Sequence, residues 1–169
     1  MQNFFLTLGL SGFPAKIAAF LAALVALIIS LFLLIYFDTN TLFLATVLLA
    51  IITIRAINRY EESGGEHHDP SIVIDKFAGI GFALSVAPAY GVGLSEMAIL
   101  SNGFLVQALL SFAFFLYFEK EKHSVIGRLY REGKGGIGIV GDDILAGFIA
   151  GIVSSLLWQS FLKFEHFIL

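Results

Sequence analysis

The sequence has no cysteine and few charged residues. Of its 169 residues, 14% are charged, whereas soluble domains use roughly 25%. The absence of cysteine excludes disulfides, a thiolate nucleophile and cysteine-ligated zinc. No basic cluster interleaved with aromatic residues is present, and the formal net charge is -3. We therefore expect no nucleic-acid partner.

The sequence is instead rich in long hydrophobic runs. Hydrophobic residues make up 58% of the chain, and the mean hydropathy is +0.90. About 20 apolar residues cross a bilayer as a helix, so we predict an all-α, multi-pass transmembrane helical bundle with about five spans, or four. We expect residues 1–169 to form a single integral membrane domain. The uncharged runs are 17–37, 39–54, 77–95, 97–118 and 144–162. The second run is short for a span unless the Arg55 side chain snorkels to the membrane surface. The third run is interrupted by Pro88, Gly91 and Gly93.

The lysines and arginines orient these predicted spans. If Lys16 is cytoplasmic, every basic residue except Lys163 falls in a cytoplasmic segment, as the positive-inside rule favours. We therefore expect a protein of the cytoplasmic (inner) membrane, with polar cytoplasmic loops near 58–76 and 119–143 and an active site facing the cytoplasm. A transporter is disfavoured, because no charge lies in mid-span and the broken third span has no inverted counterpart.

The first polar motif is HHDPSIVIDK, residues 67–76. It places Asp75 at the cytoplasmic end of the third predicted span, where a carboxylate is costly. Asp75 is either a helix-start acid favoured by the helix dipole, or a ligand or base that faces the bundle interior. His67 and His68 are adjacent and lack the i, i+4 spacing of helical zinc ligands, so a zinc site is disfavoured.

The second polar motif is GKGGIGIVGDD, residues 133–143, which leads into the last predicted span. A flexible loop with Asp142 as a helix N-cap would use the same residue types. One aspartate is enough for a cap, however, and a second carboxylate at Asp143 needs compensation, most simply by a cation. Glycines around Lys134 would let backbone N–H groups approach a phosphate.

The predicted topology places both motifs at one depth on one face of the membrane. Asp75 can then converge with Asp142 and Asp143, and carboxylate oxygens suit Mg²⁺, which also takes ligands from a substrate phosphate. Basic residues of the same cytoplasmic segment could bind the remaining phosphate oxygens, namely Lys122, Arg131 and Lys134. The two motifs together predict a magnesium site that binds a phosphate.

Small residues recur at a four-residue spacing in the last predicted span. Gly147 and Gly151 form a G-x-x-x-G pattern, which lets a second helix approach closely. We expect these glycines to serve helix packing.

The segments PSIVIDKFAG, residues 70–79, and GKGGIGIVGDDILAG, residues 133–147, resemble the two signature segments of the phosphatidylglycerophosphatase A family. The resemblance covers about residues 56–152 and is weak at SGFPAKIAAF, residues 11–20. It implies a Mg²⁺-dependent lipid phosphatase that converts phosphatidylglycerophosphate, a membrane phospholipid, into phosphatidylglycerol and phosphate at the cytoplasmic membrane face.

The resemblance also implies roles for individual residues. The acidic positions of the family match Asp75, Asp142 and Asp143, its paired glycines match Gly135 and Gly136, and the lysine of its intermediate motif matches Lys122. We predict catalytic roles for Asp75, Asp142 and Asp143, Mg²⁺ binding by these three with Glu119, and phosphate contacts by Lys76, Lys122, Arg131, Lys134, Gly135 and Gly136.

Two positions depart from the family pattern and make this a divergent member. Lys76 stands where the family has a glutamate, and a cation there would repel a metal ion. Leu116 stands where the family has an arginine, three residues before Glu119. Either Lys76 and Glu119 form an ion pair of reversed polarity, or the activity is altered. The alternative function is a catalytically silent relative that binds an anionic lipid or a partner protein.

Overall fold

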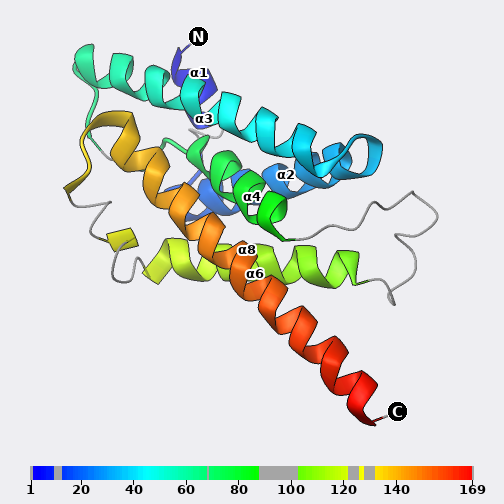
Figure 1. Cartoon of the computed structure of the whole chain (residues 1–169). Coiled ribbons are helices and arrows are strands. Elements are labelled where there is room, and N and C mark those ends of the chain that lie inside the picture. The colour runs from blue at the N-terminus through cyan, green and yellow to red at the C-terminus, as the bar shows by residue number, and fades with distance from the viewer. Residues whose placement is uncertain are drawn as a thin grey trace.

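The computed structural model describes residues 2–9, 13–67, 69–87, 103–121, 126–127 and 132–168, and every regular element in these ranges is a helix (Figure 1). The all-α prediction is therefore confirmed for the described part of the chain. The helices are α1 (Gln2–Thr7), α2 (Ala15–Tyr36), α3 (Thr39–Glu62), α4 (Asp75–Val86), α6 (Phe104–Glu121) and α8 (Gly135–Ile168).

Three of the described helices, α2, α3 and α8, are long and apolar enough to cross a membrane. They expose large apolar side chains such as Ile28, Leu44 and Leu156, as helices in contact with lipid do. These helices indicate a membrane protein.

The predicted count of five spans is not confirmed. Helix α4 has 12 residues and is therefore about 18 Å long at a rise of about 1.5 Å per residue, which is less than the roughly 30 Å of the hydrocarbon core. Helix α6 has 18 residues but ends in the charged sequence Glu119-Lys120-Glu121. Pro88, Gly91 and Gly93, which interrupt the third predicted span, lie outside the described residues.

Helices α3 and α8 are both longer than the uncharged runs that predicted them. Helix α3 continues past Arg55 to Glu62, and α8 begins at Gly135, so the loop expected near 119–143 is partly helical at both ends. Asp142 lies inside α8, and its interpretation as an N-cap is wrong. Close packing explains the glycine at the start of this helix: a Cβ atom on Gly136 would lie 2.4 Å from the Ile54 carbonyl oxygen of α3.

Helix α4 is central and packs against α2, α3, α6 and α8. Its closest approach is to α8, where a Cβ atom on Gly147 would lie 2.0 Å from the carbonyl oxygen of Gly79. One turn further along, a Cβ atom on Gly151 would lie 2.6 Å from the Ala83 carbonyl oxygen. The packing role predicted for Gly147 and Gly151 is thus confirmed.

This close packing also aligns the two acidic motifs. Asp75 precedes Gly79 by four residues on α4, and Asp143 precedes Gly147 by four residues on α8. Residues four apart share one face of a helix. The glycine contacts therefore place Asp75 and Asp143 opposite each other, one turn before the point of closest approach.

Polar contacts join α6 to α8. The Ser111 and Ser154 hydroxyls are buried and lie 2.6 Å apart, and Gln107 Nε2 donates to Ser155 Oγ at 3.4 Å. Such bonds between helices contribute to association in a bilayer, where apolar burial discriminates little. They hold α6 along α8, so that Glu119, at the far end of α6, reaches the start of α4.

Candidate functional site

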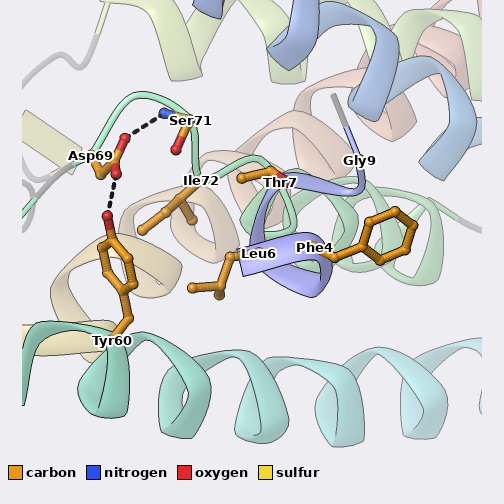
Figure 2. A pocket seen from close by; sticks show the side chains of 8 residues that line it. All are labelled: Phe4, Leu6, Thr7, Gly9, Tyr60, Asp69, Ser71 and Ile72. Atoms are coloured by element: carbon orange, nitrogen blue, oxygen red, sulfur yellow. Dashed lines mark hydrogen bonds between the residues drawn. The ribbon is translucent and has the colours of Figure 1, made fainter. Parts of the chain in front are cut away.

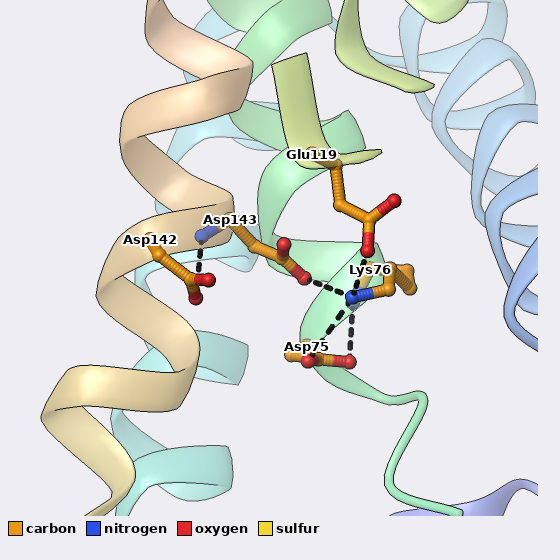
Figure 3. Close-up of polar contacts among 5 residues, drawn as sticks. All are labelled: Asp75, Lys76, Glu119, Asp142 and Asp143. Atoms are coloured by element: carbon orange, nitrogen blue, oxygen red, sulfur yellow. Dashed lines mark hydrogen bonds and ion pairs between the residues drawn. The ribbon is translucent and has the colours of Figure 1, made fainter. Parts of the chain in front are cut away.

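Carboxylates from three helices converge on one lysine (Figure 3). Lys76 Nζ lies 2.8 Å from Asp143 Oδ2 of α8, 3.3 Å from Asp75 Oδ2 of α4 and 3.3 Å from Glu119 Oε1 of α6. We call Lys76 with these three acids the ammonium cluster. The Lys76–Glu119 ion pair, one of the two alternatives raised by the sequence, is present.

Most of the ammonium cluster is buried, and only the Glu119 side chain is as much as 23% exposed. The side chain of Lys76 is 9% exposed, and those of Asp75 and Asp143 are 7% and 1% exposed. A buried charge is costly unless a partner compensates it, and here each of the three carboxylates has the ammonium within 3.3 Å. Asp75 Oδ1 also accepts a hydrogen bond from the backbone N–H of Lys76 at 3.0 Å. The single ammonium is thus shared by three carboxylates, and negative charge is in excess when all three are ionised.

The second departure from the family pattern, Leu116, lies outside the ammonium cluster. Its side chain packs against the apolar core around Phe115. Positive charge in the cluster is therefore supplied from α4 by Lys76, while α6 contributes Glu119.

A cavity of about 240 Å³ opens beside the ammonium cluster. Its polar lining comes from Lys16, Asp69, Asp75, Lys76, Glu119 and Asp142. Asp142 is 3% exposed, and its Oδ1 accepts a hydrogen bond from the Asp143 backbone N–H at 3.0 Å. Because Asp142 and Asp143 are adjacent on α8, one carboxylate reaches the cavity while the other holds Lys76.

Sequence reasoning missed two residues of this cavity. Lys16, at the start of α2, served only to orient the predicted spans, and Asp69, within the first polar motif, was given no role. The cavity lining includes both. The signal for Lys16 was its position at the N-terminal end of a predicted span, which the predicted topology places at the same level as Asp75.

Asp69 also lines a larger cavity of about 490 Å³ between α1, the end of α3 and the segment before α4 (Figure 2). Tyr60 Oη donates to Asp69 Oδ2, and the Ser71 N–H donates to Asp69 Oδ1 at 2.8 Å. Burial opposes ionisation of Asp69, but these hydrogen bonds hold its pKa below the usual value. Asp69 is therefore an ionised side chain that lines both cavities.

The glycine-rich start of α8 does not meet the ammonium cluster. Lys134 is exposed and lines neither the cavity of about 240 Å³ nor the cavity of about 490 Å³. Gly135 has a φ of 60°, and the Gly136 N–H donates to Asn58 Oδ1 at 2.7 Å. Asn58, which the sequence did not point to, thus takes the backbone donor that was predicted to bind phosphate.

Some predicted residues cannot be placed. Lys122, Arg131 and His68 lie outside the described residues. His67 Nδ1 lies 2.6 Å from Glu61 Oε1 on α3, away from the ammonium cluster.

The residues of the ammonium cluster do not fit Mg²⁺ as they stand. Among the described residues, no group of three or more His, Asp or Glu side chains is arranged to hold a metal ion. Mg²⁺ requires oxygen ligands at about 2.1 Å, whereas Asp75, Glu119 and Asp143 surround a nitrogen at 2.8 to 3.3 Å. The predicted Mg²⁺ requirement stays a prediction.

Comparison with known proteins gives one match. The family model described as Phosphatidylglycerophosphatase A matches residues 4–158. No curated protein and no solved structure gives a significant match. The matched range includes the ammonium cluster and both cavities, and it extends through most of α8.

Proposed function

This chain belongs to the phosphatidylglycerophosphatase A family, and we propose that it hydrolyses the terminal phosphate ester of phosphatidylglycerophosphate to phosphatidylglycerol and phosphate. The observation that carries the proposal is the cavity of about 240 Å³ lined by Asp142, Asp75 and two lysines. Carboxylates and cations around a small cavity are the groups that phosphoryl transfer to water needs.

The size of the cavity suits the phosphorylated end of a lipid. Ligand pockets for drug-sized molecules occupy roughly 300 to 1,000 Å³, so about 240 Å³ accommodates a headgroup and not the acyl chains. Ile17 and Phe20, next to Lys16 on α2, are about half exposed. We propose that the acyl chains lie along such apolar faces while the phosphate enters beside Lys16.

The cavity lies at a single level of the bundle. Lys16, Asp75 and Asp142 all belong to the N-terminal parts of their helices, α2, α4 and α8. We propose that this level is the cytoplasmic interface of the inner membrane, in a multi-pass protein, because the positive-inside rule assigns these ends to the cytoplasm.

In the proposed reaction, a water oxygen attacks phosphorus and the P–O bond to the glycerol oxygen breaks. In one course Asp142 or Asp75 takes the proton of the water and then passes it to the departing glycerol oxygen. In the other course one of them attacks phosphorus while the other, protonated, gives its proton to the glycerol oxygen, and water then hydrolyses the acyl phosphate and returns a proton to the second acid. Lys16 stabilises the charge on the phosphoryl oxygens directly, and Lys76, whose three N–H groups face carboxylates, adds its positive charge from the cavity wall. Asp143 and Glu119 position Lys76. No step is assigned to a metal, because Lys76 occupies the space between the expected ligands.

Phosphate release tests the proposal directly. The full chain in lipid nanodiscs receives phosphatidylglycerophosphate, phosphatidic acid or soluble glycerol 3-phosphate, with Mg²⁺ or with EDTA. We expect release from phosphatidylglycerophosphate in at least one metal condition and a loss of about 100-fold or more in Asp142→Asn, the range for a removed general base. Glu62→Gln, at the exposed end of α3, is the control. Equal rates for wild type and Asp142→Asn would refute the enzyme.

The ammonium cluster also favours a second candidate, a silent relative that binds an anionic lipid. Lys76 is paired with three carboxylates. In this candidate Lys16 alone attracts the phosphate of the lipid, and no hydrolysis follows. Retained nanodisc binding of phosphatidylglycerophosphate, weakened by Lys16→Gln, combined with no phosphate release would support this candidate over the phosphatase.

A further inference from the structure

The ammonium cluster has the composition of a cation site that is already filled. A lysine ammonium has three N–H donors, and Lys76 Nζ has three carboxylate partners from α4, α6 and α8 within 3.3 Å. Neither Asp75 nor Asp143 exposes more than 7% of its side chain. The donors of the ammonium and the acids around it therefore match in number.

Electrostatics favour a cation at this position. Carboxylates that share a buried site repel one another, and they stay ionised together only when positive charge lies between them. Lys76 supplies one positive charge that is covalently attached, so its position does not depend on the concentration of any ion. A metal ion among the same three oxygens would meet Lys76 Nζ at close range and be repelled by it.

We propose that the Lys76 ammonium takes the place of a divalent metal ion among Asp75, Glu119 and Asp143, so that this site assembles without Mg²⁺. The fold supports this assignment. Asp75 and Asp143 are placed by the glycine contacts between α4 and α8, and Lys76 extends from the first turn of α4 to meet both acids. The three helices are joined through a side chain, where a metal would join them through ligand bonds.

Metal binding by the wild-type chain is the first test. The full chain in nanodiscs is titrated with Mg²⁺ by calorimetry and with Mn²⁺ by electron paramagnetic resonance, and thermal unfolding is followed with and without Mg²⁺. We expect no saturable binding that depends on Asp143 and no Mg²⁺-dependent rise in the unfolding temperature. Saturable binding that Asp143→Asn abolishes would overturn the proposal.

Replacement of the ammonium is the second test. Lys76→Glu should bind Mg²⁺ at least ten-fold more tightly than wild type and should unfold at a higher temperature in its presence. Lys76→Met should show the same gain to a smaller degree, and it serves if Lys76→Glu does not fold. Lys163→Glu, which makes the same charge change at the far end of α8, should behave as wild type. Folded Lys76 variants without any gain would contradict a shared position for ammonium and metal.

Phosphate release in the same nanodiscs separates this proposal from the proposed function. A wild type that binds no Mg²⁺ and releases no phosphate would refute the phosphatase while supporting the ammonium as the resident cation. A wild type that binds Mg²⁺ through Asp143 and releases phosphate would refute only the ammonium assignment.

Discussion

The two halves of α8 belong to one continuous helix but have different surroundings. The N-terminal half, 135–151, is packed among the other helices, and its buried residues include Val140, Asp142, Asp143, Ala146 and Ala150. The C-terminal half, 152–168, still contacts α6 at Ser154 and Ser155 and then projects beyond the rest of the described bundle (Figure 1). Its exposed residues include Leu156, Leu157, Phe161 and Phe164.

This difference shows what hydropathy alone does not separate. Both halves are apolar, and 34 residues make a helix of about 51 Å at about 1.5 Å per residue, longer than the roughly 30 Å hydrocarbon core. Small residues and acids mark the half that packs and contributes Asp143 to the ammonium cluster, whereas large exposed leucines and phenylalanines mark the other half. Substitutions in and around the first half should therefore have much larger effects.

Loss of the ammonium should produce the largest effect. Lys76→Met leaves three carboxylates next to one another without their cation, and breaking such a buried group costs about 3 to 5 kcal/mol of stability. Thermal unfolding in detergent measures the loss. The defect should shrink at acidic pH, because protonation removes the repelling charges.

The matched substitution is Lys163→Met, which removes an exposed lysine from the C-terminal half of α8. We expect its unfolding temperature to stay near that of wild type. If both variants lost equal stability, the contrast between the two halves of α8 would be lost.

A methyl group on Gly147 should have the next largest effect. In Gly147→Ala the new Cβ would lie 2.0 Å from the Gly79 carbonyl oxygen, so α4 and α8 must separate at a cost of about 1 to 3 kcal/mol. Phosphate release should fall as well, because Asp75 and Asp143 are aligned by this contact. Unfolding and activity are compared with Ser160→Ala in the exposed half, and equal behaviour would contradict the close approach.

Removal of the side chain that binds the start of α8 should have a smaller effect. Asn58→Ala removes the acceptor of the Gly136 N–H and should cost about 1 kcal/mol, as loss of a helix cap does. Hydrogen exchange should accelerate at residues 135–138 and not at the C-terminal half. Asn40→Ala, at an exposed position of α3, provides the comparison, and unchanged exchange in Asn58→Ala would remove the capping role.

The hydroxyl contact near the middle of α8 should have the smallest effect. Ser111→Ala removes the partner of Ser154 on α8, and such bonds between membrane helices are worth about 0.6 kcal/mol. Ser154 keeps its hydrogen bond to the Gly151 carbonyl oxygen. Ser85→Ala, whose hydroxyl donates within α4 to Gly81, is the control for thermal unfolding. A loss in Ser111→Ala above that of Lys76→Met would reverse the expected order.

Hydropathy and glycine spacing predicted the helical class and the packing face of α8. They did not predict where helices begin, because Gly135 and Gly136 read as a loop until their contact with Asn58 and Ile54 is known. Nor did the length of an uncharged run predict the length of a helix: α4 ends at Val86 although residues 77–95 carry no charge. The residue at which a helix ends depends on tertiary contacts, which cannot be derived from composition.

At the site, the convergence of Asp75 with Asp143 followed from topology, and the pairing of Lys76 with Glu119 followed from two departures from a family pattern. The contribution of Lys16 to the cavity was not predicted, because a side chain from α2 reaches the cavity only through the packing of α2 against α4. The phosphate contact expected of Gly136 likewise depended on a backbone donor that Asn58 occupies.

Phosphate release by two substitutions on α8 tests the central claim most directly. Asp142→Asn changes the cavity in the buried half, and Gln159→Asn makes a conservative change in the exposed half. With phosphatidylglycerophosphate in nanodiscs, we predict a rate for Asp142→Asn that is about 100-fold or more below that of Gln159→Asn, which should match wild type. Equal rates for the two variants would contradict a catalytic site in the buried half of α8.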